Sequence, residues 1–313
     1  MTKRHLQIAL GVLWLLDGLL QLQPNMFTGV FAKKVILSAA TGQPSFVSLP
    51  MHWFASMFLL SPVLFNSLVV IIQLSIGLLI LNKRTIKAGL IGSVIWGLLV
   101  WIIGEGYGGI FSGQYSLLMG APGAAVTYSL LAMVAFPSKK EDRLYLLAFI
   151  WSGIWILGGM FFMTNQHSIT STASIARQGA IGAPSWLASI DNHVAGFIAG
   201  QGGHINNSMS AMVTSGGNNN SYYWLTLLIG LAELFVGIGV LLKTTVRKLA
   251  ITVGIILLTI FWVIGQGLGG YYTGLMTDLN TAPLLMLLGV YLLFADIDKQ
   301  LAIIGLKIKQ VII

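Results

Sequence analysis

The sequence predicts an all-α integral membrane protein, in which eight transmembrane helices form two consecutive four-helix bundles. Three observations lead to this prediction. Of 313 residues, 56% are hydrophobic and 8% are charged, whereas soluble domains carry about 25% charged residues. Apolar runs long enough for helices recur along the chain. A glycine-rich segment also occurs twice, which indicates an internal duplication.

The duplicated segment covers Trp101–Pro122 and Trp262–Pro283. The offset is 161 residues without a gap, and 10 of the 22 positions are identical. In both copies an apolar run ends in tryptophan, and one polar residue then stands between two glycines, as Gly104-Glu105-Gly106 and as Gly265-Gln266-Gly267. The glycines are expected to let the backbone break and approach a neighbouring helix closely.

Four apolar runs precede residue 139 and four follow it. We expect each to cross the membrane: Leu6–Leu22, Val63–Leu81, Ala88–Ile103, Pro122–Pro137, Leu144–Phe162, Tyr222–Leu242, Ile251–Ile264 and Pro283–Ala295. Four is an even number, so the two copies share one orientation and are related by a pseudo-two-fold axis along the membrane normal. The predicted units are residues 1–138, residues 139–297 and an amphipathic cytoplasmic tail over residues 298–313.

The last run is short. Its 13 residues make about 20 Å of helix, whereas the hydrocarbon core is roughly 30 Å thick. Either the helix starts earlier, or the glycine-rich loop before it dips into the membrane. Irregular backbone at that depth must be buried in protein or line a wet cavity.

Basic residues predict the orientation. Of the 17 lysines and arginines, 14 lie at the N-terminus, in the short turns after every second run, and in the tail. The positive-inside rule therefore places both termini in the cytoplasm and both glycine-rich loops outside. We expect a multi-pass protein of the cell membrane, whose +8 charge reflects this rule and not nucleic-acid binding.

Several chemistries are excluded or disfavoured. The chain has no cysteine, so on its own it performs no thiol exchange and holds no thiolate metal site or iron–sulfur cluster. The glycine-rich loops lack the strand–turn–helix context of a nucleotide site. His52 and His193 are matched at an offset of 141 residues, in outer connections where we expect short amphipathic helices. They are the candidates for a metal, but neither has a second histidine at ligand spacing, so we predict no metal site.

Acidic residues in or beside the apolar runs are the main candidates for a ligand pocket. A carboxylate there costs about 2.5–3.5 kcal/mol on insertion scales, so it usually faces a bundle interior or a cavity. The repeat matches Glu105 to Gln266 and Gln73 to Glu233, so each half keeps one carboxylate and one amide. We expect each carboxylate to accept a hydrogen bond from the amide of its own half. Asp17 is matched to Gly158. The alternative is that these groups only tie helices together.

The pocket candidates are Asp17, Gln73, Glu105, Glu233, Gln266, Trp101 and Trp262. The two tryptophans fit either an aromatic belt at the membrane interface or a surface that stacks on a quinone ring. No motif identifies a catalytic residue.

The stretch Leu16-Asp17-Gly18-Leu19-Leu20-Gln21 and the order of the apolar runs resemble the DoxX/DoxD-like family of small four-helix membrane proteins. That family includes a subunit of thiosulfate:quinone oxidoreductase. The resemblance implies a four-helix unit that acts as a membrane partner of redox enzymes, with quinone as a possible ligand.

Three functions follow as hypotheses. The first is a subunit of a membrane redox or respiratory assembly, which anchors a membrane or extracytoplasmic protein partner. It offers an outward-facing pocket for quinone or another lipid-soluble ligand and has no intrinsic cofactor. The second is a transporter or channel for a small solute or protons. The third is a structural or assembly protein without a ligand.

Overall fold

The computed structural model describes residues 1–113, 115–137, 143–164, 185–186 and 220–294. All regular elements in this part of the chain are helices. The eight principal ones are α1 (Lys3–Leu20), α5 (Pro62–Leu81), α6 (Ile86–Ile103), α7 (Ala124–Ala135), α8 (Arg143–Thr164), α12 (Asn220–Gly239), α13 (Thr244–Ile264) and α14 (Thr281–Leu293).

Each predicted apolar run contains one of these helices, and most ends lie within a few residues of the prediction. The largest difference is α13, which begins at Thr244 and not at Ile251, so that the basic residues Arg247 and Lys248 lie in its first turns. Within the described part of the chain, four helical stretches are long and apolar enough to cross a membrane: Pro62–Leu81, Ile86–Ile103, Leu144–Met163 and Thr244–Thr273.

Shorter elements fill the connections. Between α1 and α5 lie η1 (Pro24–Phe27), α2 (Gly29–Phe31), η2 (Ala32–Ile36), α3 (Leu37–Ala40) and α4 (Ser45–Leu60). The glycine-rich loops form η3 (Gly106–Ser112) and η5 (Gly267–Thr273), and η4 (Leu117–Met119) precedes α7. A helix is therefore present near His52 as α4, but it has 16 residues and is apolar, not short and amphipathic. His193 and residues 298–313 lie outside the described residues.

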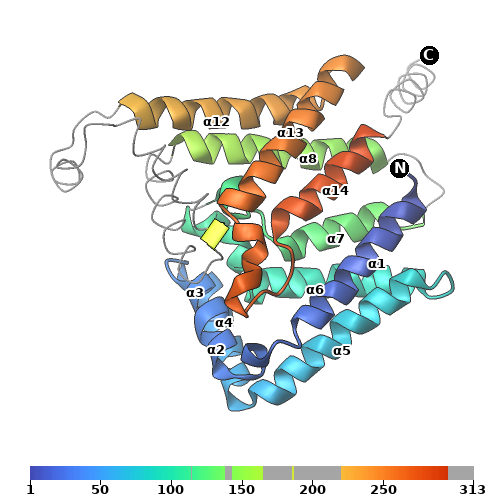
Figure 1. The fold of residues 1–313 in the computed structure, drawn as a ribbon, viewed down its shortest axis with the longest axis vertical. Coiled ribbons are helices and arrows are strands. Elements are labelled where there is room, and N and C mark those ends of the chain that lie inside the picture. Colours follow the sequence, from blue (N-terminus) through green and yellow to red (C-terminus); the bar gives the residue numbers. More distant parts are fainter. Residues whose placement is uncertain (114, 138–142, 165–184, 187–219, 295–313) are drawn as a thin grey trace.

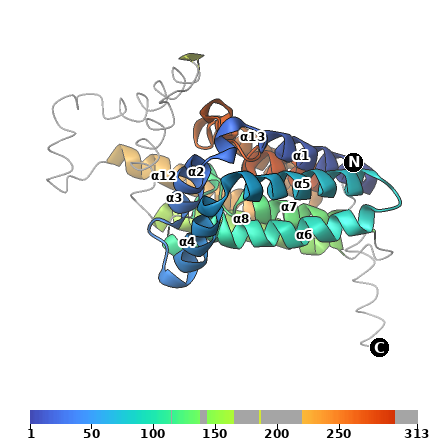
Figure 2. The ribbon, with the colours of Figure 1, turned by 90° about the horizontal axis from the view of Figure 1, so that it is seen from below.

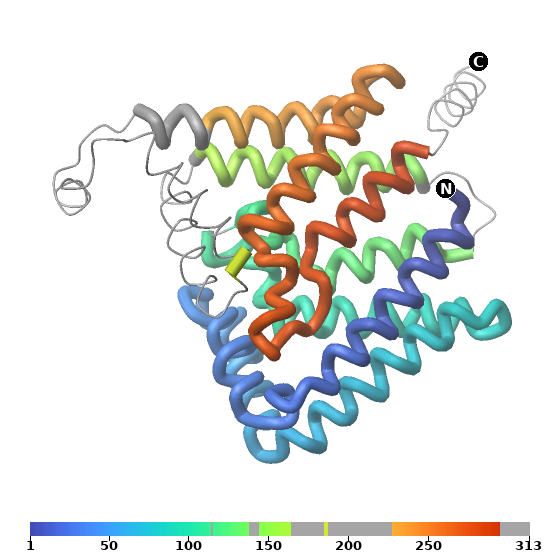
Figure 3. The backbone as a smooth tube through the Cα atoms, viewed as in Figure 1, coloured from blue at the N-terminus to red at the C-terminus, as the bar shows by residue number. Residues whose placement is uncertain are grey.

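The helices pack in chain order. Helix α1 lies against α5, α5 against α6, and α6 against α7. In the same way α8 lies against α12, α12 against α13, and α13 against α14 (Figures 1 and 3). The two groups meet where α7 touches α14, and one apolar core runs through both.

Helices α7 and α14 are the short ones at this meeting point. They have 12 and 13 residues, so each measures about 18–20 Å. Eight residues of each are buried. Helix α14 starts only two residues before the predicted Pro283, so an earlier start adds little length. Residues 115–118 and 120–123 before α7 are buried, whereas residues 277–280 before α14 are half-buried.

The glycine-rich loops each contain one left-handed turn. Residues Gly106–Gly109 all have positive φ, and so do the matched residues Gly267–Gly270. A left-handed conformation costs a non-glycine residue about 1–2 kcal/mol. Only Tyr107 (φ 59°) and Leu268 (φ 53°) bear that cost, which explains why the other three positions are glycine in both copies.

Basic residues gather at one end of the molecule. The N-terminus, the α5–α6 turn and the α12–α13 turn lie together on the right of Figure 1, and α2 to α4 lie on the opposite side, which Figure 2 shows from below. The basic residues at the first end are Lys3, Arg4, Lys83, Arg84, Lys87, Lys243, Arg247 and Lys248.

We predict that Gly108→Ala destabilises the protein much more than Gly113→Ala. Both glycines have positive φ, so each substitution costs about 1 kcal/mol of backbone strain. A Cβ at Gly108 would also collide with the Pro122 carbonyl, whereas nothing lies within 4 Å of one at Gly113. Thermal unfolding in detergent compares the two variants. Equal losses would contradict this account of the turn.

Candidate functional site

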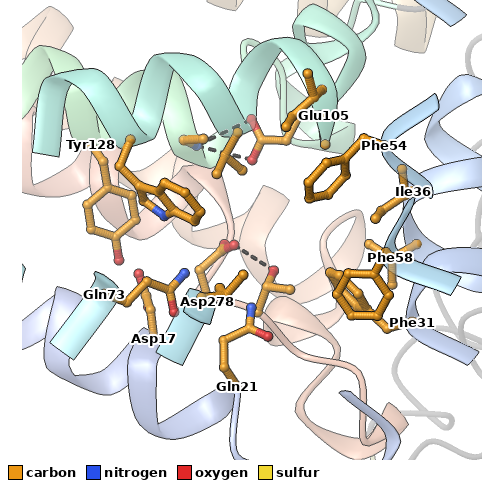
Figure 4. Close-up of a pocket in the computed structure, with 18 of the residues that line it drawn as sticks. Asp17, Gln21, Phe31, Ile36, Phe54, Phe58, Gln73, Glu105, Tyr128 and Asp278 are labelled. Carbon is orange, nitrogen blue, oxygen red and sulfur yellow. Dashed lines mark hydrogen bonds between the residues drawn. The ribbon is translucent and has the colours of Figure 1, made fainter. Parts of the chain in front are cut away.

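A cavity of about 110 Å³ lies within the first group of helices, closed on its outer side by η2 and α4. Three carboxyl groups line it: Asp17 from α1, Glu105 from the loop after α6, and Asp278 from the segment before α14 (Figure 4). Asp278 belongs to the second half of the sequence, so both halves contribute to the site.

Glu105 caps the N-terminus of α7. The Ala125 backbone N–H donates to both carboxylate oxygens, at 3.1 and 3.3 Å. The first N–H groups of a helix have no partner within it, and the helix dipole favours a negative group there. Gly123 has φ 113°, and a Cβ on it would collide with the Glu105 carboxylate. Glycine at this position therefore makes the cap possible.

Asp278 is fixed by its own loop. The Thr277 hydroxyl donates to Oδ2 and the Asn280 N–H donates to Oδ1, both at 2.7 Å. The Gln23 side-chain amide donates to the Met276 carbonyl at 2.7 Å, which anchors this loop to the segment after α1. The loop thereby holds Asp278 over the cavity.

Several buried polar atoms of the cavity wall have no hydrogen-bond partner among the described residues. They are Asp17 Oδ1, Gln21 Oε1, Gln73 Oε1, the Tyr128 hydroxyl and Trp96 Nε1. Figure 4 shows the Tyr128 hydroxyl pointing towards Asp17 and Gln73. Buried polar groups are nearly always satisfied in proteins, by water or a ligand if not by protein. Four of the five atoms are oxygens that can accept a hydrogen bond, which favours a ligand that donates hydrogen bonds.

The rest of the wall is aromatic and apolar. Trp14 packs against Tyr128 with ring centroids 4.4 Å apart, and its indole N–H donates to the Ser93 hydroxyl at 2.8 Å. Phe31, Phe54 and Phe58 form the side nearest η2 and α4. Aromatic faces attract cations, and more strongly where water is excluded.

No lysine, arginine or histidine occurs among the described residues that line the cavity. Burial, and then the neighbouring Asp278 carboxylate, raises the pKa of Glu105 to about 8. Burial also raises the pKa of Asp278 above its usual value. A pKa of about 8 favours the protonated form of Glu105 at neutral pH, and a bound cation would favour its ionised form.

A second hollow of about 410 Å³ shares part of its lining with the cavity. We call it the vestibule; it is lined mainly by polar residues and glycines, and the exposed Ser38 and Thr41 lie at its edge. Glu105 and Asp278 line both the vestibule and the cavity. These two carboxyl groups therefore lie at the boundary between the two hollows.

Three of the predicted pocket residues, Asp17, Gln73 and Glu105, meet in the cavity. The predicted hydrogen bond between Glu105 and Gln73 does not form, because the α7 N-terminus offers Glu105 a closer donor. Likewise Gln266 does not bond to Glu233. Its Oε1 accepts from the Ala282 N–H at 3.0 Å, which caps α14 as Glu105 caps α7.

The other candidates lie elsewhere. The Trp101 indole donates to the Pro122 carbonyl at 2.7 Å, and the Trp262 indole donates to the Leu279 carbonyl at 2.8 Å. Both tie down the loops before the short helices and are not part of the cavity wall. His52 is exposed, and no group of three potential metal ligands occurs among the described residues.

Sequence reasoning missed Asp278, Tyr128, Gln21, Trp14 and Trp96 as cavity residues. The repeat matches Asp278 to Leu117, so the duplication carried no signal for it. Trp14 and Trp155 are matched in the repeat at an offset of 141 residues, but only the packing of the helices shows that Trp14 lines the cavity.

No family model, curated protein or solved structure matches this chain.

We predict that Glu105→Gln weakens the pH dependence of stability. Because the folded pKa is about 8 and the ordinary value is 4.5, stability from this group is complete below pH 4.5. It is lost as the pH rises towards 8, by at most about 1.4 kcal/mol per pH unit. Glutamine keeps an acceptor for the Ala125 N–H, as Gln266 does for Ala282. Unfolding in detergent at a series of pH values measures the slope, and an unchanged slope would contradict the assignment.

Proposed function

We propose that this chain is a multi-pass membrane transporter that binds a small organic cation in the acidic cavity and receives it through the vestibule. The observation that carries the proposal is the set of three carboxyl groups that share one small cavity without a basic partner among its described lining. A cation would neutralise them, and the unpartnered oxygens of Asp17, Gln21 and Gln73 would accept its hydrogen bonds.

The size and walls of the cavity support an organic ion. Its volume of about 110 Å³ is of the order of an engineered 150 Å³ cavity that holds benzene. The aromatic rings of Trp14, Trp96 and Tyr128 offer cation–π contacts, which favour amines and amidines over strongly hydrated metal ions.

The site also suits transport. We infer that eight helices cross the membrane as two four-helix halves, with the basic end in the cytoplasm. Asp278 comes from one half, and Asp17 and Glu105 come from the other. Movement of one half against the other would therefore separate the carboxyl groups and lower the affinity, as alternating access requires.

We predict that Ser112→Cys and Thr273→Cys react with a membrane-impermeant thiol reagent added outside intact cells, and that Lys83→Cys does not. The natural chain has no cysteine, so label on the purified protein comes only from the introduced residue. Ser112 and Thr273 belong to the glycine-rich loops, and Lys83 lies in the α5–α6 turn. The reverse labelling pattern would overturn the orientation.

We predict that acetamidinium stabilises the purified protein, whereas acetamide, its neutral isostere, does not. Binding to the folded state stabilises it by a free energy that grows with the ratio of ligand concentration to Kd, so the melting temperature rises with ligand concentration. Asp278→Asn and Asp17→Asn should each weaken the effect, because each removes one negative charge from the cavity. Asp278→Glu keeps the charge and serves as the matched control. Equal responses to both probes would contradict cation binding.

Transport itself is tested by uptake of labelled acetamidinium into proteoliposomes, with Asp278→Asn and Asp278→Glu beside the natural protein. Saturable uptake that Asp278→Asn reduces supports the proposal. Saturable binding without uptake would leave a receptor or channel-like site and would contradict a transporter.

A second candidate is a membrane subunit of a redox assembly that binds quinone and a protein partner. The observation that favours it is that Asp17 and Gln21, which stand in the DoxX-like stretch, line a cavity with aromatic walls. Lipid extraction of gently purified protein distinguishes the two candidates. A stoichiometric quinone that Asp17→Asn removes would favour this candidate, and a chain free of quinone and partner would count against it.

A further inference from the structure

Another buried carboxyl group, Glu233 on α12, lies outside the cavity. Its side chain is 0% exposed, and neither carboxylate oxygen has a hydrogen-bond partner among the described residues. A buried carboxylate costs several kcal/mol unless a bound group compensates it. Glu233 faces α8 at Gly158, where an added Cβ would lie 2.8 Å from Glu233 Oε2.

The side chain of Leu117 fills the space beside this carboxylate. The same added Cβ on Gly158 would lie 2.8 Å from Leu117 Cδ1, so Leu117 and Glu233 meet at one point. Leu117 is 1% exposed, and its carbonyl accepts a hydrogen bond from Gln266 Nε2 at 3.0 Å. Leu117 belongs to the loop before α7, so it reaches from the first half of the chain into the second.

These four residues correspond to the four polar positions of the cavity. The repeat matches Gly158 to Asp17, Glu233 to Gln73, Gln266 to Glu105, and Leu117 to Asp278. Each half therefore inserts one residue of its outer loop into the other half. Asp278 brings a carboxylate to the first half, and Leu117 brings an apolar side chain to the second.

Tyr115 lies on the same loop as Leu117 and belongs to the same surroundings. Its hydroxyl donates to the Ile154 carbonyl of α8 at 3.3 Å. Burial, and then the charge of Glu233, raises the pKa of this hydroxyl. A tyrosine and a carboxylate thus lie near each other at this place, as Tyr128 and Asp17 do in the open cavity.

We propose that Glu233 marks a second binding site for a small organic cation, and that the Leu117 side chain closes it. The inference rests on the proposed function of the first cavity. Leu117 and Asp278 then decide which half of the protein binds: a carboxylate at this position completes an acidic site, and leucine fills the corresponding space.

The first test asks whether removing the leucine opens the site, and it needs no knowledge of the ligand. A water-soluble carbodiimide with glycine ethyl ester labels carboxyl groups that water reaches, and peptide mass spectrometry locates the label. We expect Glu233 to be unlabelled in the natural protein and labelled in Leu117→Ala. The matched control is Leu118→Ala, because Leu118 is also buried but packs against Gly265.

The second test uses acetamidinium. Isothermal titration should give one bound cation per chain for the natural protein and two for Leu117→Asp, which copies the Asp278 position. Leu117→Val provides a milder opening if the alanine variant does not fold. Absence of label on Glu233 in folded Leu117 variants, with one cation still bound, would overturn the proposal. A natural protein that binds no acetamidinium would overturn the proposed function instead. Labelling of Glu233 in the Leu117 variants alone would still show that Leu117 closes the space beside Glu233.

Discussion

Burying a carboxyl group away from water costs several kcal/mol unless a proton, a cation or hydrogen-bond donors compensate it. The cavity brings three such groups together, and no basic side chain occurs among its described lining. Two of the three use fixed donors: the α7 N-terminus serves Glu105, and Thr277 with Asn280 serves Asp278. Asp17 retains an unpartnered oxygen. The remaining compensation must come from protons or from a ligand, and this requirement links the fold to the proposed function.

The glycine-rich loops position the Glu105 carboxyl group and the matched Gln266 amide. Four residues in the left-handed conformation turn the chain after α6 and after α13, and the next helix then begins beside the polar residue of the loop. Glu105 and Gln266 consequently hold the same structural position as caps of α7 and α14. The left-handed turn is the same in both halves, but the side chain that it presents is a carboxyl group in one half and an amide in the other. A carboxylate can exchange a proton for a cation, whereas an amide can only cap the helix.

Much of the fold could be predicted from the sequence, because apolar runs, basic turns and glycine pairs are local signals. The sites of helices α1, α5 and α6 followed from hydropathy alone, and the importance of Glu105 followed from its place between two glycines. Partners could not be predicted in this way. Glu105 bonds to Ala125 and not to Gln73, because the exposed donors of a helix terminus compete successfully with a side-chain amide. Asp278 was missed because it reaches the cavity from the other half of the chain, through contacts that no local pattern encodes.

The central claim is that the cavity exchanges protons for a cation, and infrared difference spectroscopy tests it most directly. The measurement compares the purified protein at neutral pH with and without acetamidinium, and follows the C=O stretching band of protonated carboxyl groups. We expect the cation to reduce this band and to increase the carboxylate bands. We expect Glu105→Gln to remove most of the change, because burial raises the pKa of Glu105 to about 8. A protonated-carboxyl band that is the same with and without the cation, while acetamidinium binds, would contradict the central claim.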